Sequence, residues 1–237
     1  MNGEVMIATP AYGGQVYTGY VSSLISTLDL LRQADIPYFT YMIGNESLIS
    51  RARNECASVA RDRGAKKLMF IDADQSWDPR QFYRLYVSKL PVVGGGYPKK
   101  TFPIDYAFNP LDEDRKYFNG PKNIDDIRSW AAQSPNNIGK GIMRVRHIAT
   151  GFLMIDMDVF DQMIEKIPER VPEYATFASR CGGRDRDFFP VKVTNDRLMG
   201  EDWAFCDNCR EIGVDVHLDT MCLCHHTGTF TWRSNHA

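Results

Sequence analysis

The stretch Leu68-Met69-Phe70-Ile71-Asp72-Ala73-Asp74 decides the fold of this 237-residue chain. Its four consecutive apolar residues predict a short strand buried on both faces, as in a parallel sheet. Two carboxylates follow directly at i and i+2, and on an extended segment both point to the same side. Oxygen ligands in that arrangement suit a hard divalent cation bound to a diphosphate. Acidic residues also commonly end a strand and open a turn, so the tripeptide alone leaves both readings open.

Strands and helices alternate on both sides of this stretch. The periodicity predicts strands over 5–8, 38–43 and 92–93, and helices over 16–31, 47–63 and from Asp78-Pro79 onward. This alternation indicates βαβ units, and hence an α/β, Rossmann-like domain with a central, mainly parallel sheet flanked by helices. Such sheets bind ligands beyond the carboxyl ends of their strands, which is where Asp72 and Asp74 stand.

The second half of the chain is less regular. Residues 101–141 are polar, interrupted by prolines and without periodicity, which predicts an inserted or variable region. Further along, the pattern predicts strands over 152–155 and 214–218, helices over 159–164 and 201–213, and a mobile loop over 180–187. We therefore expect one domain over residues 1–237.

The charge balance excludes binding of a polyanion by overall charge. The chain has 28 Lys and Arg against 30 Asp and Glu, for a net charge of -2. Nucleic acid would need a local basic patch, for which the candidates are Lys99, Lys100, Lys140, Arg144 and Arg146. An ordinary solvated surface is the alternative. No apolar run approaches the roughly 20 residues of a membrane span, and residues 1–8 lack a secretory leader. We expect a cytoplasmic protein without a membrane partner.

Four motifs follow one another along the chain: Ala8-Thr9-Pro10-Ala11-Tyr12, the D-x-D of residues 72–74, Thr150-Gly151-Phe152-Leu153-Met154-Ile155, and Gly200-Glu201-Asp202. In this order they resemble the GT-A fold glycosyltransferases, over nearly the whole length of the chain. More narrowly, residues 47–54, 70–74 and 92–100 and the closing His226-Thr227-Gly228 resemble small glycosyltransferase-like proteins of tailed phages and other large DNA viruses. For a viral protein the location would be the host cytoplasm.

The resemblance implies a metal-dependent glycosyltransferase that moves a sugar from a nucleoside diphosphate donor, a UDP-sugar, to a hydroxyl group. The cofactor would be Mn²⁺ or Mg²⁺. Residues 1–100 would form the nucleotide-sugar-binding half, 101–141 a variable insertion, and 142–237 the acceptor and catalytic half. The implied acceptor is a hydroxymethylated base in viral DNA, with a glycan or a protein as alternatives. Nucleotidyl transfer also uses metal-bridging carboxylates, but residues 12–15 lack the basic residue that its phosphate loop usually carries.

The resemblance also implies roles for individual residues. Nucleotide-sugar binding falls to Thr9, Pro10, Tyr12, Arg53, Asn54, Asp72, Ala73 and Asp74, with Tyr12 stacked on the base. The metal ligands are Asp72, Asp74 and His226. His225 is the rival of His226, because neighbours on a strand face opposite ways. Acceptor contacts fall to Lys99, Lys100, Thr150 and Gly151.

The acidic pair Glu201-Asp202 has two readings. Inverting members of the superfamily use a carboxylate at this helix start to take the proton of the acceptor hydroxyl, which makes Asp202 the candidate base and Glu201 its catalytic neighbour. Acidic residues also cap helices, because they accept hydrogen bonds from free backbone amides. For Arg51, diphosphate binding and an ion pair with Glu46, Glu55 or Asp62 are equally open.

The cysteines suggest a competing function. Cys206, Cys209, Cys222 and Cys224 stand in a C-x2-C and a C-x-C-H-H pattern, which is compatible with a structural zinc ion in a non-catalytic binding module. However, Cys206 and Cys209 fall one turn apart inside a predicted helix, where core thiols are the simpler interpretation.

Overall fold

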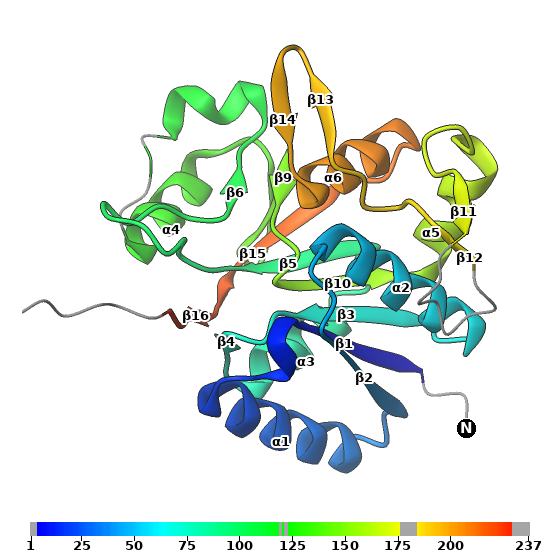
Figure 1. The fold of residues 1–237 in the computed structure, drawn as a ribbon. Coiled ribbons are helices and arrows are strands. Elements are labelled where there is room, and N and C mark those ends of the chain that lie inside the picture. The colour runs from blue at the N-terminus through cyan, green and yellow to red at the C-terminus, as the bar shows by residue number, and fades with distance from the viewer. Residues whose placement is uncertain (1–3, 119, 121–122, 176–183, 229–237) are drawn as a thin grey trace, which may run out of the picture.

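The computed structural model describes residues 4–118, 120, 123–175 and 184–228 (Figure 1). Its centre is an eight-stranded sheet with the order β2-β1-β3-β10-β5-β15-β8-β7. The strands are β1 Val5–Ala11, β2 Tyr38–Gly44, β3 Lys67–Ile71, β5 Val92–Gly96, β7 Asn137–Gly139, β8 Ile142–Val145, β10 Phe152–Asp156 and β15 Val216–Leu223. Only β10 and β8 run against the direction of the others in this sheet. The α/β class and the mainly parallel sheet are confirmed.

Helices cover both faces of the sheet (Figure 1). Helices α1 Thr18–Gln33 and α3 Pro79–Val87 lie on one side, and α2 Ile49–Asp62, α4 Ile124–Gln133, α5 Met157–Lys166 and α6 Glu201–Glu211 on the other. Successive side chains of a strand point to opposite faces. In β3, Leu68 and Phe70 therefore join the core under α2 and α6, while Met69 and Ile71 join the core under α1 and α3.

Short elements outside the main sheet complete the described chain. Two-stranded pairs are β4 Gln75–Ser76 with β16 His225–His226, β6 Phe108–Asn109 with β9 His147–Ile148, β11 Glu173–Ala175 with β12 Arg184–Arg186, and β13 Lys192–Thr194 with β14 Arg197–Met199. The 3-10 helices are η1 Tyr12–Gly14 and η2 Asp112–Tyr117. Among the described residues, no helix has the length and apolar character needed to cross a membrane.

Residues 101–141, which lack periodicity in the sequence, nevertheless form regular elements. This range contains η2, helix α4 and strand β7, which joins the edge of the main sheet. Asn123 caps α4 by accepting a hydrogen bond from the Asp126 amide, and Ile127, Trp130 and Ala131 bury one face at helical spacing. The helix is short and its start lies close to a proline, so its periodicity was missed. Of the predicted mobile loop, residues 180–183 lie outside the described residues, and Arg184–Arg186 form β12.

Candidate active site

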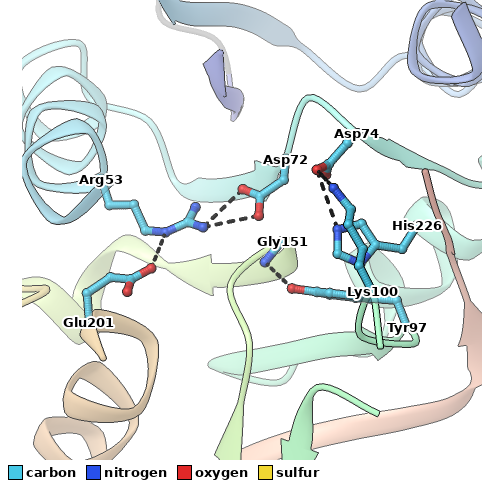
Figure 2. Close-up of polar contacts among 8 residues, drawn as sticks. All are labelled: Arg53, Asp72, Asp74, Tyr97, Lys100, Gly151, Glu201 and His226. Carbon is cyan, nitrogen blue, oxygen red and sulfur yellow. Dashed lines mark hydrogen bonds and ion pairs between the residues drawn. The ribbon is translucent and has the colours of Figure 1, made fainter. Parts of the chain in front are cut away.

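The acidic pair Asp72 and Asp74 lies in a turn that begins directly after β3. The Gln75 amide donates to the Asp72 carbonyl at 3.0 Å, so residues 72–75 bend instead of continuing as a strand. The expectation that Asp72 and Asp74 point the same way was therefore wrong, because it assumed an extended backbone. Figure 2 shows that the two carboxylates face different partners, Asp72 facing Arg53 and Asp74 facing Lys100 and His226.

Arg53 ties three elements together at this point. Its side chain is only 3% exposed, and it reaches from α2 to Asp72 at the end of β3 and to Glu201 in the first turn of α6. The Nη2–Oδ1 distance to Asp72 is 3.0 Å and the Nε–Oε1 distance to Glu201 is 3.3 Å. The guanidinium also lies over the Phe70 ring, 5.2 Å from its centroid. Burial acts to lower the pKa of Arg53, but the charges of Asp72 and Glu201 raise it above its ordinary value.

Asp74 contacts Lys100 and His226 through one carboxylate oxygen. Its Oδ2 lies 2.5 Å from Lys100 Nζ and 3.4 Å from His226 Nε2, while its Oδ1 is buried and has no hydrogen-bond partner among the described residues. Burial acts to raise the pKa of Asp74, but hydrogen bonds from His226 and Lys100 outweigh it and lower the pKa to about 2. Asp74 is thus a stable anion at neutral pH.

His226 reaches Asp74 because β16 pairs with β4, which places His226 opposite Gln75. Its Nδ1 lies 2.9 Å from the Pro98 carbonyl oxygen, which can only accept, so Nδ1 carries a hydrogen and Nε2 is the nitrogen that faces Asp74. A backbone carbonyl on the other ring nitrogen is the usual support of a metal-binding histidine. His225 is exposed, as expected for the neighbour on a strand.

These residues fit a divalent cation bound together with substrate. No group of three His, Cys, Asp or Glu side chains suited to a metal occurs in the described part of the chain. Asp74 and His226 provide a carboxylate oxygen, Oδ2, and an imidazole nitrogen, Nε2, that face each other, whereas Asp72 is engaged by Arg53. Mg²⁺ and similar ions are commonly held by one or two protein ligands plus phosphate oxygens and water. The structure thus favours a two-residue set over the predicted three ligands, because Asp72 faces away.

Of the predicted nucleotide-sugar-binding residues near β1, Tyr12 has an exposed side chain. Thr9 and Pro10 are buried within β1, which runs on to Ala11, and the Thr9 hydroxyl bonds to Tyr20. The strand predicted over 5–8 therefore extends through both residues, and the Thr9 side chain belongs to the core. Tyr12, in η1, is 75% exposed and free to stack on a ring.

The side chains of Asn54 and Arg51 make contacts within the protein. The buried Asn54 amide donates to Asp187 and accepts from the Phe189 backbone, so it holds residues 187–189 against α2. Arg51 pairs with Glu46 at 2.6 Å, which is the ion-pair alternative. Neither side chain is directed at Asp74 by these contacts.

A cavity of about 500 Å³ is lined by Asp202 and by Lys100 and His226, the two residues that contact Asp74. Its lining comes from five stretches of the chain and consists of Tyr97, Lys99, Lys100, Ala107, Ala149, Leu198, Gly200, Asp202, Trp203 and His226. Burial, and next the charge of Glu201, raise the pKa of Asp202 to about 6. Gly200 is the N-cap of α6 and no side chain caps it, while Asp202 Oδ1 accepts from the Trp203 amide. Asp202 is therefore not the N-cap residue itself, but it accepts from a free amide of the first turn, as the capping interpretation expects.

Thr150 and Gly151 are buried next to this cavity. The Gly151 amide donates to the Tyr97 hydroxyl at 3.1 Å (Figure 2). A Cβ atom at Gly151 would lie 2.5 Å from Tyr97 Oη and 2.8 Å from Asp72 Oδ2, so a larger residue requires these groups to move. The Thr150 hydroxyl is buried without a partner among the described residues. Neither residue lines the cavity.

Two aromatic residues of the cavity wall were missed by sequence reasoning. Trp203 stacks on His147 with 4.9 Å between ring centroids and 3° between planes, and Tyr97 meets the His226 ring edge-on at 5.3 Å. His147 and Trp203 are far apart in the sequence, so no local pattern predicts their contact. Tyr97 directly follows the glycine run of β5, and this position after a predicted strand could have marked it as a site residue.

The zinc interpretation is wrong for the described cysteines. Cys206 and Cys209 belong to the core under α6, while Cys222 and Cys224 belong to the core on the opposite face of the sheet. The four thiols therefore cannot surround one ion. Cys181 lies outside the described residues.

The basic residues proposed for nucleic acid are mostly paired with carboxylates. Lys99 bonds to Asp105 at 2.5 Å, Arg144 to Asp215 at 3.2 Å and Arg146 to Asp112 at 3.0 Å. Together with the pair between Lys100 and Asp74, these contacts neutralise four of the five candidates locally.

Comparison with models of known protein families gave no match, and comparison with curated proteins gave none either. Among solved structures, the chain is similar to a crystal structure of GalNAc-T7 with UDP, GalNAc and Mn²⁺, with a TM-score of 0.50 and 9% identity. The match covers 98% of this chain and 45% of that chain, so this chain spans less than half the length of that protein.

A Bacillus anthracis structure named as a glucose-1-phosphate thymidylyltransferase, in complex with a sucrose, also matches. It has 11% identity and a TM-score of 0.33, with 68% of this chain and 74% of that chain covered, and at that score it carries no argument. At such identities the first match establishes the fold alone. The chain therefore has a GT-A-like α/β fold.

Proposed function

We propose that this protein is a metal-dependent glycosyltransferase that moves a sugar from a UDP-sugar to a hydroxyl group. The main support is one cavity that is lined by Asp202, Lys100 and His226. Asp202 has a pKa of about 6, and Lys100 and His226 contact the anionic Asp74. A base and a cation site facing one space are what transfer between a diphosphate donor and a hydroxyl requires.

On the donor side, Asp74 and His226 would hold the divalent cation. When bound, the cation supplies positive charge that stabilises the departing diphosphate. Tyr12 is exposed and able to stack on the uracil ring. Arg53 does not face the cavity, so its proposed role is to position Asp72 and Glu201.

On the acceptor side, Asp202 would act as the general base. The acceptor oxygen forms a bond to the anomeric carbon, the bond from that carbon to the diphosphate oxygen breaks, and the hydroxyl proton passes to the Asp202 carboxylate. A base with a pKa of about 6 is mostly ionised at pH 7 and remains basic enough to accept the proton. This role requires inversion at the anomeric carbon.

For the acceptor, the ion pairs favour a glycan over a hydroxymethylated base in viral DNA. Binding to duplex DNA rests on basic side chains that neutralise phosphates. Here Lys99, Arg144 and Arg146 are paired with carboxylates, and a DNA phosphate would have to displace those partners. Apolar and aromatic side chains of the cavity, such as Trp203 and Leu198, suit the apolar face of a sugar ring.

The test is an incubation of the purified protein with Mn²⁺ and a panel of nucleotide sugars, scored for free nucleoside diphosphate. We expect the protein to release UDP from one UDP-sugar. Excess chelator should abolish this release. Parallel reactions with a nucleoside triphosphate and a sugar 1-phosphate, scored for pyrophosphate, test nucleotidyl transfer. Pyrophosphate release without UDP release overturns the proposal.

The acceptor is tested next with the active donor. Glycans, 5-hydroxymethylcytosine DNA, 5-hydroxymethyluracil DNA and unmodified DNA are offered separately, and sugar incorporation is measured on each. Incorporation into glycan alone supports the acceptor proposed here. Incorporation into either modified DNA contradicts it and leaves the glycosyltransferase proposal intact.

A further inference from the structure

Lys100 occupies the side of Asp74 that a cation would need. Its ammonium lies 2.5 Å from Oδ2, the same oxygen that faces His226 Nε2 at 3.4 Å (Figure 2). Figure 2 shows the Lys100 side chain running beside His226 toward this oxygen. An ammonium and a divalent cation cannot both bind Asp74 Oδ2 on the side that faces His226, because they compete for one position and repel each other.

The fold directs Lys100 to this position. The backbone before it is fixed by the bridge between Pro98 and Tyr106 and by the hydrogen bond from the Lys99 amide to the Asp105 carbonyl. The aliphatic stem of Lys100 lies against Gly228, where a Cβ atom would come within 3.0 Å of Lys100 Cδ. Thr227, the neighbour of Gly228, donates its amide to the Asp74 carbonyl. The segment that supplies His226 therefore also shapes the path of Lys100.

We propose that Lys100 is a tethered counter-ion that holds the cation position on Asp74 until a divalent cation and the donor arrive together. The cation part of this inference rests on the contacts of Asp74, and the donor part rests on the proposed function. On displacement, the ammonium remains in the cavity that it lines with Asp202 and His226. There the diphosphate of the donor is its natural partner, because ammonium groups bind phosphate as point charges.

A coupling of metal and donor binding follows. Without a nucleotide, the cation must break the Lys100 pair and leaves the ammonium without a partner. With a diphosphate present, the cation and the ammonium both have anionic partners. Wild-type protein should therefore bind Mn²⁺ weakly alone and more tightly with UDP.

The first experiment measures Mn²⁺ binding by electron paramagnetic resonance of the free ion, without nucleotide, at one fixed pH. Lys100→Met should bind Mn²⁺ about fivefold more tightly than wild type, because a partly exposed ion pair contributes up to roughly the free energy of a several-fold change. Lys100→Arg keeps the charge and should stay close to wild type. Equal affinity of Lys100→Met and wild type overturns the proposal.

Lys99→Met is the matched control for the general effect of removing a positive charge. Lys99 also lines the cavity, but its ammonium lies on Asp105. Its Mn²⁺ affinity should equal that of wild type. The same tightening in Lys99→Met and Lys100→Met would mean that a long-range field, and not occupation of Asp74, controls the ion, and would overturn the inference.

The second experiment measures UDP binding by calorimetry at saturating Mn²⁺. Lys100→Met should lose about fivefold in UDP affinity, since the displaced ammonium no longer meets the diphosphate. Unchanged UDP affinity together with tighter Mn²⁺ binding overturns the transfer of Lys100 to the donor. If wild type hydrolyses no nucleotide sugar but Lys100→Met still tightens Mn²⁺ binding, the proposed function fails and the counter-ion role stands.

Discussion

The proposed cation site depends on the charge of a single carboxylate, Asp74. Asp74→Asn keeps the shape of the side chain and removes that charge, so we expect loss of Mn²⁺-dependent turnover with an unchanged circular dichroism spectrum. The matched control is Asp78→Asn. Asp78 caps α3 and pairs with Arg80 away from the cavity, and Asn caps almost as well as Asp. Full turnover of Asp74→Asn would contradict the cation site.

The Asp202 carboxylate should favour the catalytic rate and lower the stability of the folded protein. As the general base it must be ionised, so the rate should rise with pH through about 6. Asp202→Asn should lower the rate by about a hundredfold or more, with little change in donor binding. Steady-state kinetics measured from about pH 5 to about pH 8 check both expectations. An unchanged rate would contradict the base assignment.

The same substitution should stabilise the folded protein at neutral pH. Because the folded-state pKa of Asp202 is raised to about 6, the native state holds its proton more firmly than the unfolded state does. Stability should therefore fall as pH rises from the ordinary Asp range through about 6. Asp202→Asn removes this penalty, and each kcal/mol recovered raises the melting temperature by about 2–4 °C in a chain of this size. Melting curves at pH 4 and pH 8, roughly below and above the window, should show the gain only at the higher pH.

Among the elements, α2, β3 and α6 depend on Arg53 as their common polar contact. Arg53→Met leaves Asp72 and Glu201 without their buried partner, and breaking such a pair costs about 3–5 kcal/mol. Urea unfolding should show this loss. Glu201→Gln in the Arg53→Met background should recover part of it, because one unpaired charge is removed.

Arg61→Met is the control within the same helix. Arg61 pairs with Asp161 at an exposed site, where such pairs contribute about 0.2–1 kcal/mol. A loss in Arg53→Met no larger than that in Arg61→Met would contradict the positioning role of Arg53.

Elements were predictable from sequence where one local pattern determined them. The apolar run of β3 and the Asp78-Pro79 start of α3 contain their own signals, and both are confirmed. Helix α4 was missed because its buried face is short. The direction of Asp72 was wrong because Arg53 and the turn at Gln75, and not the strand period, determine it. Pairings such as β4 with β16 join distant segments, and no local pattern encodes them.

The whole molecule should unfold as one unit, in keeping with the proposal of a single domain over residues 1–237. Strand β10, from the second half, lies between β3 and β5, from the first half. A fragment of residues 1–100 therefore lacks the strand that joins its own strands into one sheet. We expect this fragment to be unfolded by circular dichroism and rapidly proteolysed, whereas a folded fragment would contradict the single domain.

For the full chain, fluorescence and circular dichroism should report one coincident transition. Trp77 and Trp130 lie in the cores on opposite faces of the sheet, so fluorescence reports on both faces. Separate transitions would mean that the two cores unfold independently.

The contact between Gly151 and Tyr97 restricts how this protein can change in evolution. A methyl group at position 151 meets the Tyr97 hydroxyl and the Asp72 carboxylate at once, so either position can vary only if the other makes room. In natural variants of this chain, a residue larger than glycine at 151 should be accompanied by loss of the hydroxyl at 97. A collection of related sequences should therefore show positions 97 and 151 varying together, and lineages that retain Asp72 and Tyr97 should retain the glycine as well.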